Sequence, residues 1–567
     1  MAVETANLVV VGAGIYGLQM AKVYIHLHPT HKIIILDGNK SLGGTWSRDR
    51  IYPGLKANNI LGWFEYPDMP LTADEFDVKA GDHIKAEAFN AYLETYAERF
   101  HVTERLRLNT RVVSIQHAAG AGCTAKSMRK GLLSPPDTSE ALLPWFPGQE
   151  TFQPPLFHTK DWAQHQDILK SAKSAVVLGG GKSAFDAAYM LADAGVKCHM
   201  VIRSSGHGPA WMSQYLLTPF KIGLESLVNT RAIGWFSPCV WAHYGGYGLL
   251  RRFLHGTWLG RRIVDGFWAI LQIDNINLSG LQGHPTTERL MPWSDLFWSG
   301  TSCSILNYEK DFYQFVRTGL IEVHVADVEQ LAADAVVLST GERLRVDAVA
   351  CATSWKVRPA INFLPAGSEA KLGLPHYDSN PDREERFATA DAQIFKAFPK
   401  LLQQPIVNTH LAKLPTAKEE PFDPTRCNVP YLLYRFMVPP AYLHERSIAF
   451  LGVPTCFAQG IMSTANALWI TAYFNGQIEV PALEEAVAET ALHARHARWR
   501  NPAGYGASFP DWIFDTMPFL DMVFGDLGMS SWIKTGFWKD AFTPYYPRDF
   551  AGIVELYRRK CMVGSGK

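Results

Sequence analysis

The sequence predicts an α/β protein with two Rossmann-like dinucleotide-binding domains. Two glycine-rich turns, "VVVGAGIYG" at residues 9–17 and "VVLGGGKSA" at residues 176–184, each join an apolar run to a helix-like stretch. The length of 567 residues also exceeds what one hydrophobic core usually supports. Turns and length together favour two nucleotide-binding domains in one chain.

The first unit, "NLVVVGAGIYGLQMAKVYIHLHPTHKIIILD", follows the order strand, tight turn, helix, strand. Gly12 permits the turn, Gly14 lets the backbone approach a pyrophosphate, and Gly17 lets the helix pack on the strand. The helix N-terminus adds amide donors and a favourable dipole. Asp37 ends the second strand, where a carboxylate can accept both ribose hydroxyls. The alternative is a structural glycine turn followed by a surface aspartate.

The second unit repeats this order of elements, with Gly179, Gly181 and Ala184 at the equivalent spacing. Lys182 and Ser183 follow within the turn, and we place both among the cofactor-binding residues. The unit therefore predicts a second nucleotide site.

Arg203 stands at the end of this unit's second strand, where the first unit carries an acid. A guanidinium pairs with a 2′-phosphate that a carboxylate would repel, so this site should prefer NADP to NAD. His207 lies nearby and could add charge. The alternative for Arg203 is a solvated surface arginine.

Composition narrows the function classes. Lys+Arg and Asp+Glu balance at 54 each, which gives no support for a nucleic-acid partner. The 8 cysteines include no CxxC pair, so neither a zinc site, nor a disulfide framework, nor the redox pair of a flavin disulfide reductase is indicated. The N-terminus enters a strand at once, and no stretch offers about 18 uninterrupted apolar residues. We therefore expect a cytoplasmic protein without a secretory signal.

An aromatic-rich insertion interrupts the second unit at about residues 211–300. Its stretch Trp235–Leu271 is dense in Trp, Phe and Arg and broken by glycines, which argues against a regular element. One interpretation is a buried lid on the nucleotide domain, and another is a cover over a substrate tunnel. A third is a membrane interface that carries arginines near lipid phosphate: Arg251, Arg252, Arg261 and Arg262. Each favours a lipophilic substrate.

Six motifs stand in order along nearly the whole chain: "GAGIYG", "GGTW" (43–46), "YPG" (52–54), "FQPPLFHTKDW" (152–162), "GGGKSAFDAA" and "ATSW" (352–355). In this order they resemble the class B flavoprotein monooxygenases, the family of the flavin-containing and Baeyer–Villiger monooxygenases. The resemblance implies FAD in the first domain, contacted also by Gly44, Thr45 and Trp46, and NADP in the second.

The resemblance also implies a domain order with a discontinuous FAD domain. We expect its first part at 1–165, the NADP domain with the insertion at 166–335, the second part of the FAD domain at 336–480, and a helical and aromatic extension at 481–567.

Three departures from the family pattern affect the linker. The fingerprint FxGxxxHxxx(F/Y/W) has Pro154 in place of glycine, with His158 and Trp162 intact; in the family this histidine helps organise the cofactors. An ordinary packed histidine is the alternative. The family's second ATG appears with Ser354 in place of glycine, and the first is not recognisable. Because residues 118–143 contain no apolar run, we expect a shortened FAD domain there.

The resemblance implies that NADPH reduces FAD, that oxygen then gives a C4a-(hydro)peroxyflavin, and that NADP stays bound while this species meets the substrate. No metal is needed, and no histidine shows ligand spacing. The protein's part is to position the flavin and exclude water.

Asn58 and His158 are the two predicted catalytic residues, and Asn58 is the one expected beside the flavin. In Baeyer–Villiger enzymes the loop after GGTW carries an aspartate that helps keep the flavin peroxide deprotonated, whereas flavin-containing monooxygenases carry asparagine at the corresponding place. Counting from Tyr52-Pro53-Gly54, that place is Asn58, and the nearby Lys56 is a weaker candidate for orienting cofactor or substrate. An amide donates and accepts without a charge. The alternative is an Asx turn.

Three functions follow from these motifs. The first is oxygenation of a lipophilic nitrogen or sulfur compound with NADPH and molecular oxygen, and the second is Baeyer–Villiger oxygenation of a ketone to an ester or lactone. The third is a catalytically impaired binding or scaffold relative, which the changes at Pro154 and Ser354 make conceivable.

Overall fold

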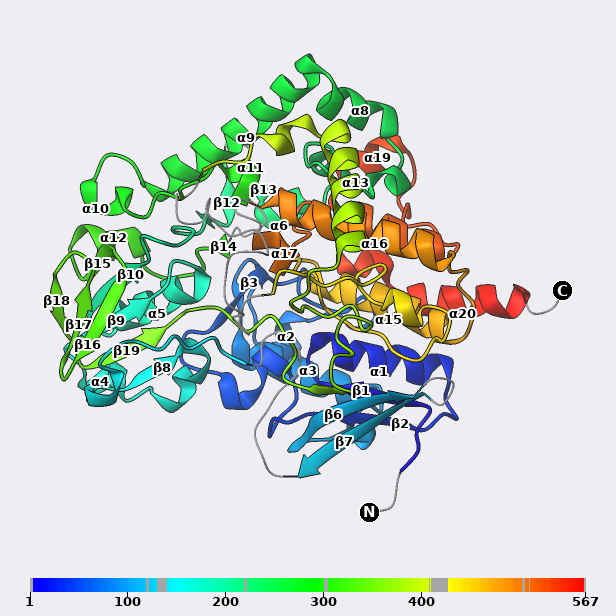
Figure 1. Ribbon diagram of the computed structural model, residues 1–567, viewed down its shortest axis with the longest axis horizontal. Helices are drawn as coiled ribbons and strands as arrows, with labels where there is room; N and C mark the ends of the chain where they lie inside the picture. Colours follow the sequence, from blue (N-terminus) through cyan, green and yellow to red (C-terminus); the bar gives the residue numbers. More distant parts are fainter. Residues whose placement is uncertain are drawn as a thin grey trace.

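The computed structural model of the protein describes residues 4–118, 122–129, 140–218, 222–299, 304–406, 408, 427–501, 505–508 and 510–564. Parallel strands and helices follow both glycine turns, in two regions that lie on different sides of the molecule (Figure 1). This arrangement confirms the predicted α/β class with two Rossmann-like units.

The first glycine turn connects β1 (Leu8–Val11) to α1 (Ile15–Leu27), and α1 leads to β2 (Ile33–Leu36). Strands β1 and β2 form a parallel sheet with β5 (Leu106–Arg107). Helix α15 (Gln459–Phe474) packs along α1, and nearly all its residues are buried. A helix from the C-terminal half of the sequence is therefore part of the core of the first unit.

The second sheet contains five parallel strands in the order β15-β10-β9-β19-β8. Their bounds are β8 (Leu156–His158), β9 (Ser174–Leu178), β10 (Lys197–Ile202), β15 (Ile321–Val325) and β19 (Ala348–Cys351). Strand β8 precedes residue 166 and β19 follows residue 335, so the sheet draws strands from both sides of the segment expected to form this domain.

Helices cover one face of this sheet and a small meander covers the other. Helices α5 (Lys182–Asp193) and α12 (Phe312–Arg317) share one core with the sheet. Strands β16 (Val328–Ala332), β17 (Ala335–Leu338) and β18 (Arg343–Arg345) pair as antiparallel hairpins and share a separate core with it. These short hairpins thus cover the second face of the sheet.

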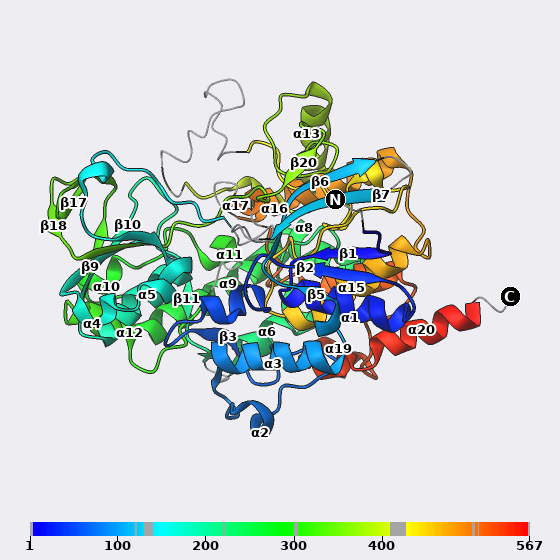
Figure 2. The ribbon, with the colours of Figure 1, turned by 90° about the horizontal axis from the view of Figure 1, so that it is seen from below.

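A third sheet includes part of the stretch in which the sequence predicts a shortened first domain. Strand β6 (Thr110–Ala118) lies between β7 (Gly122–Arg129) and β20 (Asn362–Leu364), with β7 antiparallel to β6. Figure 2 shows β6 and β7 beside the first sheet. Strand β7 forms although its sequence has no apolar run, because an edge strand can form through backbone hydrogen bonds to one neighbour.

The insertion is more regular than its glycines predict. It forms α6 (Leu224–Val228), α7 (Arg231–Gly234), α8 (Gly248–Gly256) and an unbroken helix α9 (Trp258–Ser279). Gly260 does not break α9 but permits its contact with α8, since a Cβ there would lie 2.0 Å from the Phe253 carbonyl oxygen. The insertion packs one face on the core of the second unit, as a lid does.

The remaining elements complete the fold around these units. They are α2 (Ala73–Phe76), α3 (Ala86–Arg99), α4 (Ile168–Ser171), α10 (Pro285–Glu288), α11 (Leu296–Ser299), α13 (Pro381–Ala397), α16 (Leu483–Arg500), α17 (Tyr505–Ser508), α18 (Thr516–Asp526), α19 (Phe537–Phe542), α20 (Ile553–Gly564), β3 (Lys56–Ile60), β4 (His83–Lys85), β11 (Met212–Ser213), β12 (Leu216–Leu217), β13 (Ile222–Gly223) and β14 (Ser304–Ile305). Among the described residues, no helix combines the length and apolarity needed to cross a bilayer.

Candidate functional site

The first glycine turn is closed by backbone packing that excludes side chains. Gly12 has a φ of +105°, in the left-handed region that favours glycine. A Cβ on Gly17 would lie 1.9 Å from the Gly12 carbonyl oxygen, whereas a Cβ on Gly14 would lie 3.6 Å from the Gly44 Cα. The GGTW segment therefore lies directly against the turn, and Gly14 is the position with room on its surface.

Asp37 holds this turn in shape. Its carboxylate accepts hydrogen bonds from the backbone N–H groups of Ala13 and Asn39, both at 2.7 Å. The side chain is buried, and burial raises its pKa. Each oxygen keeps a further lone pair at the end of β2, where the ribose of a dinucleotide is expected. The glycines and Asp37 thus fit the ADP half of FAD.

The GGTW segment is anchored by its tryptophan. Gly43 and Gly44 both have positive φ, and Thr45 is exposed at the start of a short helical turn. The Trp46 ring packs edge-on against Phe64 and Phe89, with centroids 5.7 and 5.4 Å away. Trp46 therefore fixes the segment in the core, while Thr45 faces outward.

The second glycine turn lies against the ATSW segment. Gly179 has a φ of +139°, and a Cβ there would lie 2.5 Å from the Ala352 carbonyl oxygen. A Cβ on Gly181 would meet nothing within 4 Å. Gly181 and Ser183 are exposed at the N-terminus of α5. This open helix N-terminus suits a pyrophosphate.

His158 joins the linker to the ATSW segment. Its Nδ1 accepts a hydrogen bond from the Lys160 backbone N–H, and its Nε2 lies 3.1 Å from the Ser354 carbonyl oxygen, to which the neutral ring donates. Burial lowers the pKa of His158 to about 4, so the ring is neutral at pH 7. Ser354 has a φ of +74°, in the region for which the family uses glycine. His158 thus positions the linker.

Lys182 takes part in a network between the two units. Its Nζ donates to Asp186, to Asn307 Oδ1 at 2.7 Å and to the Tyr308 hydroxyl at 3.3 Å. The ammonium therefore faces protein groups, whereas the sequence suggested a contact with cofactor.

Asn307 extends this network to strand β3. Its Nδ2 donates to the carbonyl oxygens of Lys56 and Ala57, both at 3.1 Å. Strand β3, which carries Asn58, is thereby fastened through Lys182 to the helix that starts at the second glycine turn. Sequence reasoning missed Asn307 because no motif marks it.

The two asparagines of β3 face opposite ways. Ala57 and Asn59 are buried, whereas Lys56, Asn58 and Ile60 are half-buried. Asn59 donates to the Phe457 carbonyl oxygen at 3.4 Å. The Lys56 ammonium pairs with Glu309 at 3.1 Å. Asn58 therefore has the more accessible side of the strand, as a residue that meets a ligand requires.

Glu225 on α6 supports β3 from the other side, and the sequence analysis missed it. Its side chain is fully buried, and its Oε1 accepts the Ile60 backbone N–H at 3.3 Å. Burial raises its pKa to about 8, against the effect of hydrogen bonds from Asn59, Ile60 and Tyr215. A neutral carboxylic acid of the insertion thus touches the strand that carries Asn58.

Arg203 is exposed directly after β10, as the sequence predicts. Burial lowers the pKa of His207, and the Arg203 charge lowers it further. Burial raises the pKa of Asp327, but hydrogen bonds from Ser204 and Ser205 and the charge of Arg203 lower it overall. Arg203 is therefore accessible to a phosphate but has a carboxylate nearby.

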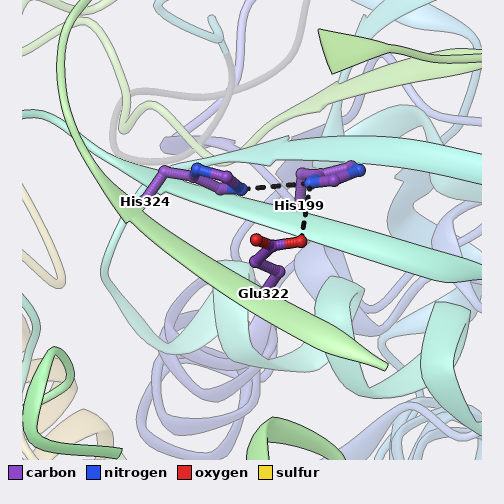
Figure 3. A group of neighbouring side chains, drawn as sticks. All are labelled: His199, Glu322 and His324. Carbon is purple, nitrogen blue, oxygen red and sulfur yellow. Dashed lines mark hydrogen bonds and ion pairs between the residues drawn. The ribbon is translucent and has the colours of Figure 1, made fainter. Parts of the chain in front are cut away.

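A cluster of His199, Glu322 and His324 lies on one face of β10 and β15 (Figure 3). The two rings are hydrogen-bonded, with His199 Nδ1 3.0 Å from His324 Nε2. Glu322 pairs with Lys197 at 2.9 Å, and the other ring nitrogen of His324 lies 3.1 Å from Glu342. Residue spacing along the chain did not predict this grouping. Because the Lys197 ammonium already pairs with the Glu322 carboxylate, we interpret the cluster as a hydrogen-bonded contact between the sheet and the meander.

The chain is similar over its whole length to known enzymes. No protein-family model matches it. It is 32% identical over 582 aligned positions to the FAD-dependent monooxygenase resA of Aspergillus sclerotiorum, covering 97% of both chains. It is also 32% identical to an FAD-dependent monooxygenase of Pyrenophora dematioidea, covering 93% of this chain and 98% of the relative. The chain belongs to the FAD-dependent monooxygenases.

The fold of this monooxygenase agrees with that assignment. It is similar to cyclohexanone monooxygenase from Rhodococcus sp. Phi1 bound to NADP+, with a TM-score of 0.56 at 15% identity and coverage of 93% of this chain and 98% of that chain. The resemblance to class B flavoprotein monooxygenases is therefore confirmed. FAD is the cofactor of the monooxygenase, and the first glycine turn with Asp37 fits it.

Proposed function

We propose that this FAD-dependent monooxygenase uses NADPH and molecular oxygen to oxygenate a lipophilic nitrogen or sulfur compound. FAD, when bound, supplies the redox chemistry and activates oxygen. The chain's own residues bind both dinucleotides, place Asn58 beside the reacting centre and keep water away from it.

The observation that carries this proposal is the position of β3 between the two glycine turns. The strand follows the GGTW segment, which lies against the FAD turn, and Asn307 fastens it to Lys182 at the second turn. Asn58 therefore lies on the element that joins the two nucleotide sites. An amide at this place can donate to a developing oxyanion or orient a substrate without adding charge.

The other site residues hold the linker, leave room for the cofactors and cover the substrate in this proposal. His158 stays neutral and donates to Ser354, which holds the linker against the second sheet. Gly14 and Gly181 leave room for two pyrophosphates. The insertion contacts β3 through Glu225 and packs its aromatic helices on the core of the second unit, and in this proposal it covers the lipophilic substrate.

The purified protein tests the proposal directly. We expect a yellow protein whose flavin absorption is bleached by NADPH under nitrogen and restored by air. A panel of lipophilic sulfides, amines and ketones then separates heteroatom oxygenation from Baeyer–Villiger oxygenation by the product formed. Flavin that NADPH does not reduce would favour the scaffold interpretation and contradict the proposal.

Replacing Asn58 should uncouple the reaction. We expect Asn58→Asp and Asn58→Ala to retain FAD and NADPH oxidation, while product per NADPH falls on the order of 10- to 100-fold, because one positioned donor is removed. Hydrogen peroxide should rise by the amount of product lost. The measurement is oxygen uptake, peroxide and product per NADPH consumed.

Asn59 provides a neighbouring control for Asn58. Because Asn59 is buried and hydrogen-bonded, Asn59→Ala should lower the thermal unfolding midpoint, whereas the Asn58 variants should not. Coupled turnover at the wild-type rate in either Asn58 variant would remove Asn58 from the chemistry.

Replacing Arg203 should weaken the preference for NADPH. We expect Arg203→Ala to raise KM for NADPH about 10- to 100-fold while leaving KM for NADH unchanged, since a charged hydrogen bond contributes about 1.5–3 kcal/mol. The matched control is Arg345→Ala, because the Arg345 side chain is 81% exposed on the meander. Equal effects on both nucleotides would show that Arg203 does not read the 2′-phosphate.

A further inference from the structure

Exposed large apolar side chains gather on three helices of the monooxygenase: α8, α9 and α19. The ten residues, which we call the apolar rim, are Leu249, Phe253, Trp258, Leu259, Ile263, Ile270, Ile273, Phe537, Trp538 and Phe542. Leu249, Trp538 and Trp258 are 78%, 74% and 67% exposed. Isolated apolar residues are normal on a protein surface, but a group of this size on adjacent helices marks an interaction site.

Helix α9 presents an apolar stripe to solvent over most of its length. Leu259, Ile263, Ile270 and Ile273 follow one another at helical spacing and are all exposed. The opposite face, which includes Trp268, is buried in the core. A helix that only covered a core would expose polar residues instead, so the outer face of α9 is built for a second apolar contact.

Helix α19 continues this surface next to α8. Tyr247, the residue before α8, lies with its ring centroid 5.5 Å from that of Trp532 and 6.1 Å from that of Phe537. The ring centroids of Trp235 and Phe542 lie 5.7 Å apart. Figure 1 shows α8 and α9 along the upper margin of the molecule with α19 beside α8.

Cations flank the apolar rim. Arg252, Arg262 and Lys539 are exposed and Arg261 is half-exposed, and none of the four forms an ion pair with a carboxylate of the described residues. Arg251, which the sequence placed with them, instead points inward, where burial lowers its pKa beside Cys239 and Asp515.

The carboxylates of α9 are engaged elsewhere. Asp265 pairs with Lys400, and Asp274 accepts the Thr218 backbone N–H at 2.9 Å. The rim is therefore positively charged although the whole chain has a formal net charge of zero.

We propose that the apolar rim docks this monooxygenase on the surface of an anionic membrane. Tryptophan rings suit the headgroup layer, isoleucine and leucine suit the acyl boundary, and guanidinium groups pair with lipid phosphate. A second copy of the chain fits less well, because a two-fold contact would bring the same four cations together. Helix α9, with 22 residues and a length of about 33 Å, lies along the surface and does not cross it.

Docking would bring a lipid phase to the insertion whose helix α6 contacts β3. A lipophilic substrate that dissolves in the membrane would then be concentrated beside the candidate site. The docking itself does not depend on the proposed chemistry, so each can fail without the other.

The test uses the FAD-loaded full chain and vesicle flotation. We expect binding to vesicles of phosphatidylcholine with phosphatidylserine, and much weaker binding to phosphatidylcholine alone. The triple variant Arg252→Gln/Arg262→Gln/Lys539→Gln should reduce partitioning of the protein onto anionic vesicles on the order of a hundredfold, because each of the three lost cations contributes about fivefold. Trp258→Gln/Ile270→Gln/Trp538→Gln should abolish it.

The control variant is Trp145→Gln, because Trp145 is 71% exposed outside the apolar rim and should not affect binding. Flavin absorbance and the unfolding midpoint show whether each variant is folded. Wild-type protein that does not float with anionic vesicles, or rim variants that float as well as wild type, would overturn the proposal. A wild-type dimer that the apolar variant dissociates would assign the rim to self-association instead.

Discussion

Gly17→Ala should strongly destabilise the first domain or prevent it from folding, whereas Gly14→Ala should fold but bind FAD much more weakly. The added Cβ at position 17 would lie 1.9 Å from the Gly12 carbonyl oxygen, so α1 would have to move away from the turn. At position 14 the new Cβ would make ordinary contacts at 3.6 Å, and a φ of −82° suits alanine. That Cβ would instead occupy the space of the cofactor pyrophosphate.

The two variants are distinguished by measuring folding and flavin content separately. We expect Gly17→Ala to give insoluble protein or an unfolding midpoint at least 10 °C lower, and Gly14→Ala to give soluble apoprotein with native circular dichroism, on the order of a hundredfold weaker in FAD affinity.

Gly181→Ala is the matched control at the second turn. A Cβ there meets nothing within 4 Å, so this variant should keep FAD and raise only KM for NADPH. Full flavin content in Gly14→Ala would show that the pyrophosphate is not bound at this turn.

Glu225→Gln should make the protein more stable than wild type at pH 9 but not at pH 5. Between the ordinary carboxyl pKa of 4.5 and about 8, folded Glu225 keeps a proton that the unfolded chain has released. The folded state then binds more protons, so the free energy of unfolding falls as pH rises through this range, by up to about 5 kcal/mol. Glutamine does not ionise, and its carbonyl can still accept the Ile60 N–H.

The measurement is the thermal unfolding midpoint of wild type and variant at pH 5, 7 and 9. Glu225→Ala is the contrasting variant, because it leaves the Ile60 N–H without its acceptor and opens a cavity. It should be about 2–4 kcal/mol less stable than wild type at pH 5, and this deficit should shrink as pH rises because alanine also removes the ionising group. Unfolding midpoints of wild type and Glu225→Gln that stay parallel over this range would show that Glu225 is not protonated as its burial implies.

The same ionisation should affect catalysis if the proposed role of Asn58 is correct. A charged Glu225 would disturb Ile60 and Asn59, which share β3 with Asn58. Coupling of NADPH use to product should then fall above pH 8 in wild type and stay level in Glu225→Gln.

Much of the fold could be predicted because its signals are local. The glycine turns, the strand that ends at Asp37 and the strand that ends before Arg203 each lie within a few tens of residues, and turn chemistry and periodicity report on such distances. The left-handed φ of Ser354 is likewise at the place where the family motif carries glycine. The sequence pattern did not predict α9, because Gly260 resembles a helix break. In the tertiary structure Gly260 instead permits the close contact between α9 and α8.

The sequence alone therefore determined the α/β class, the two dinucleotide turns and the monooxygenase family. Only the tertiary structure decided how the sites are joined: Asn307 to β3, Glu225 to Ile60 and His158 to Ser354. These partners lie more than 150 residues apart in the chain, and no local pattern encodes such a contact. The tertiary structure also determined which side chains are buried. Arg251 lies inward and buried Glu225 stays neutral, whereas the apolar residues on one side of α9 are exposed to water.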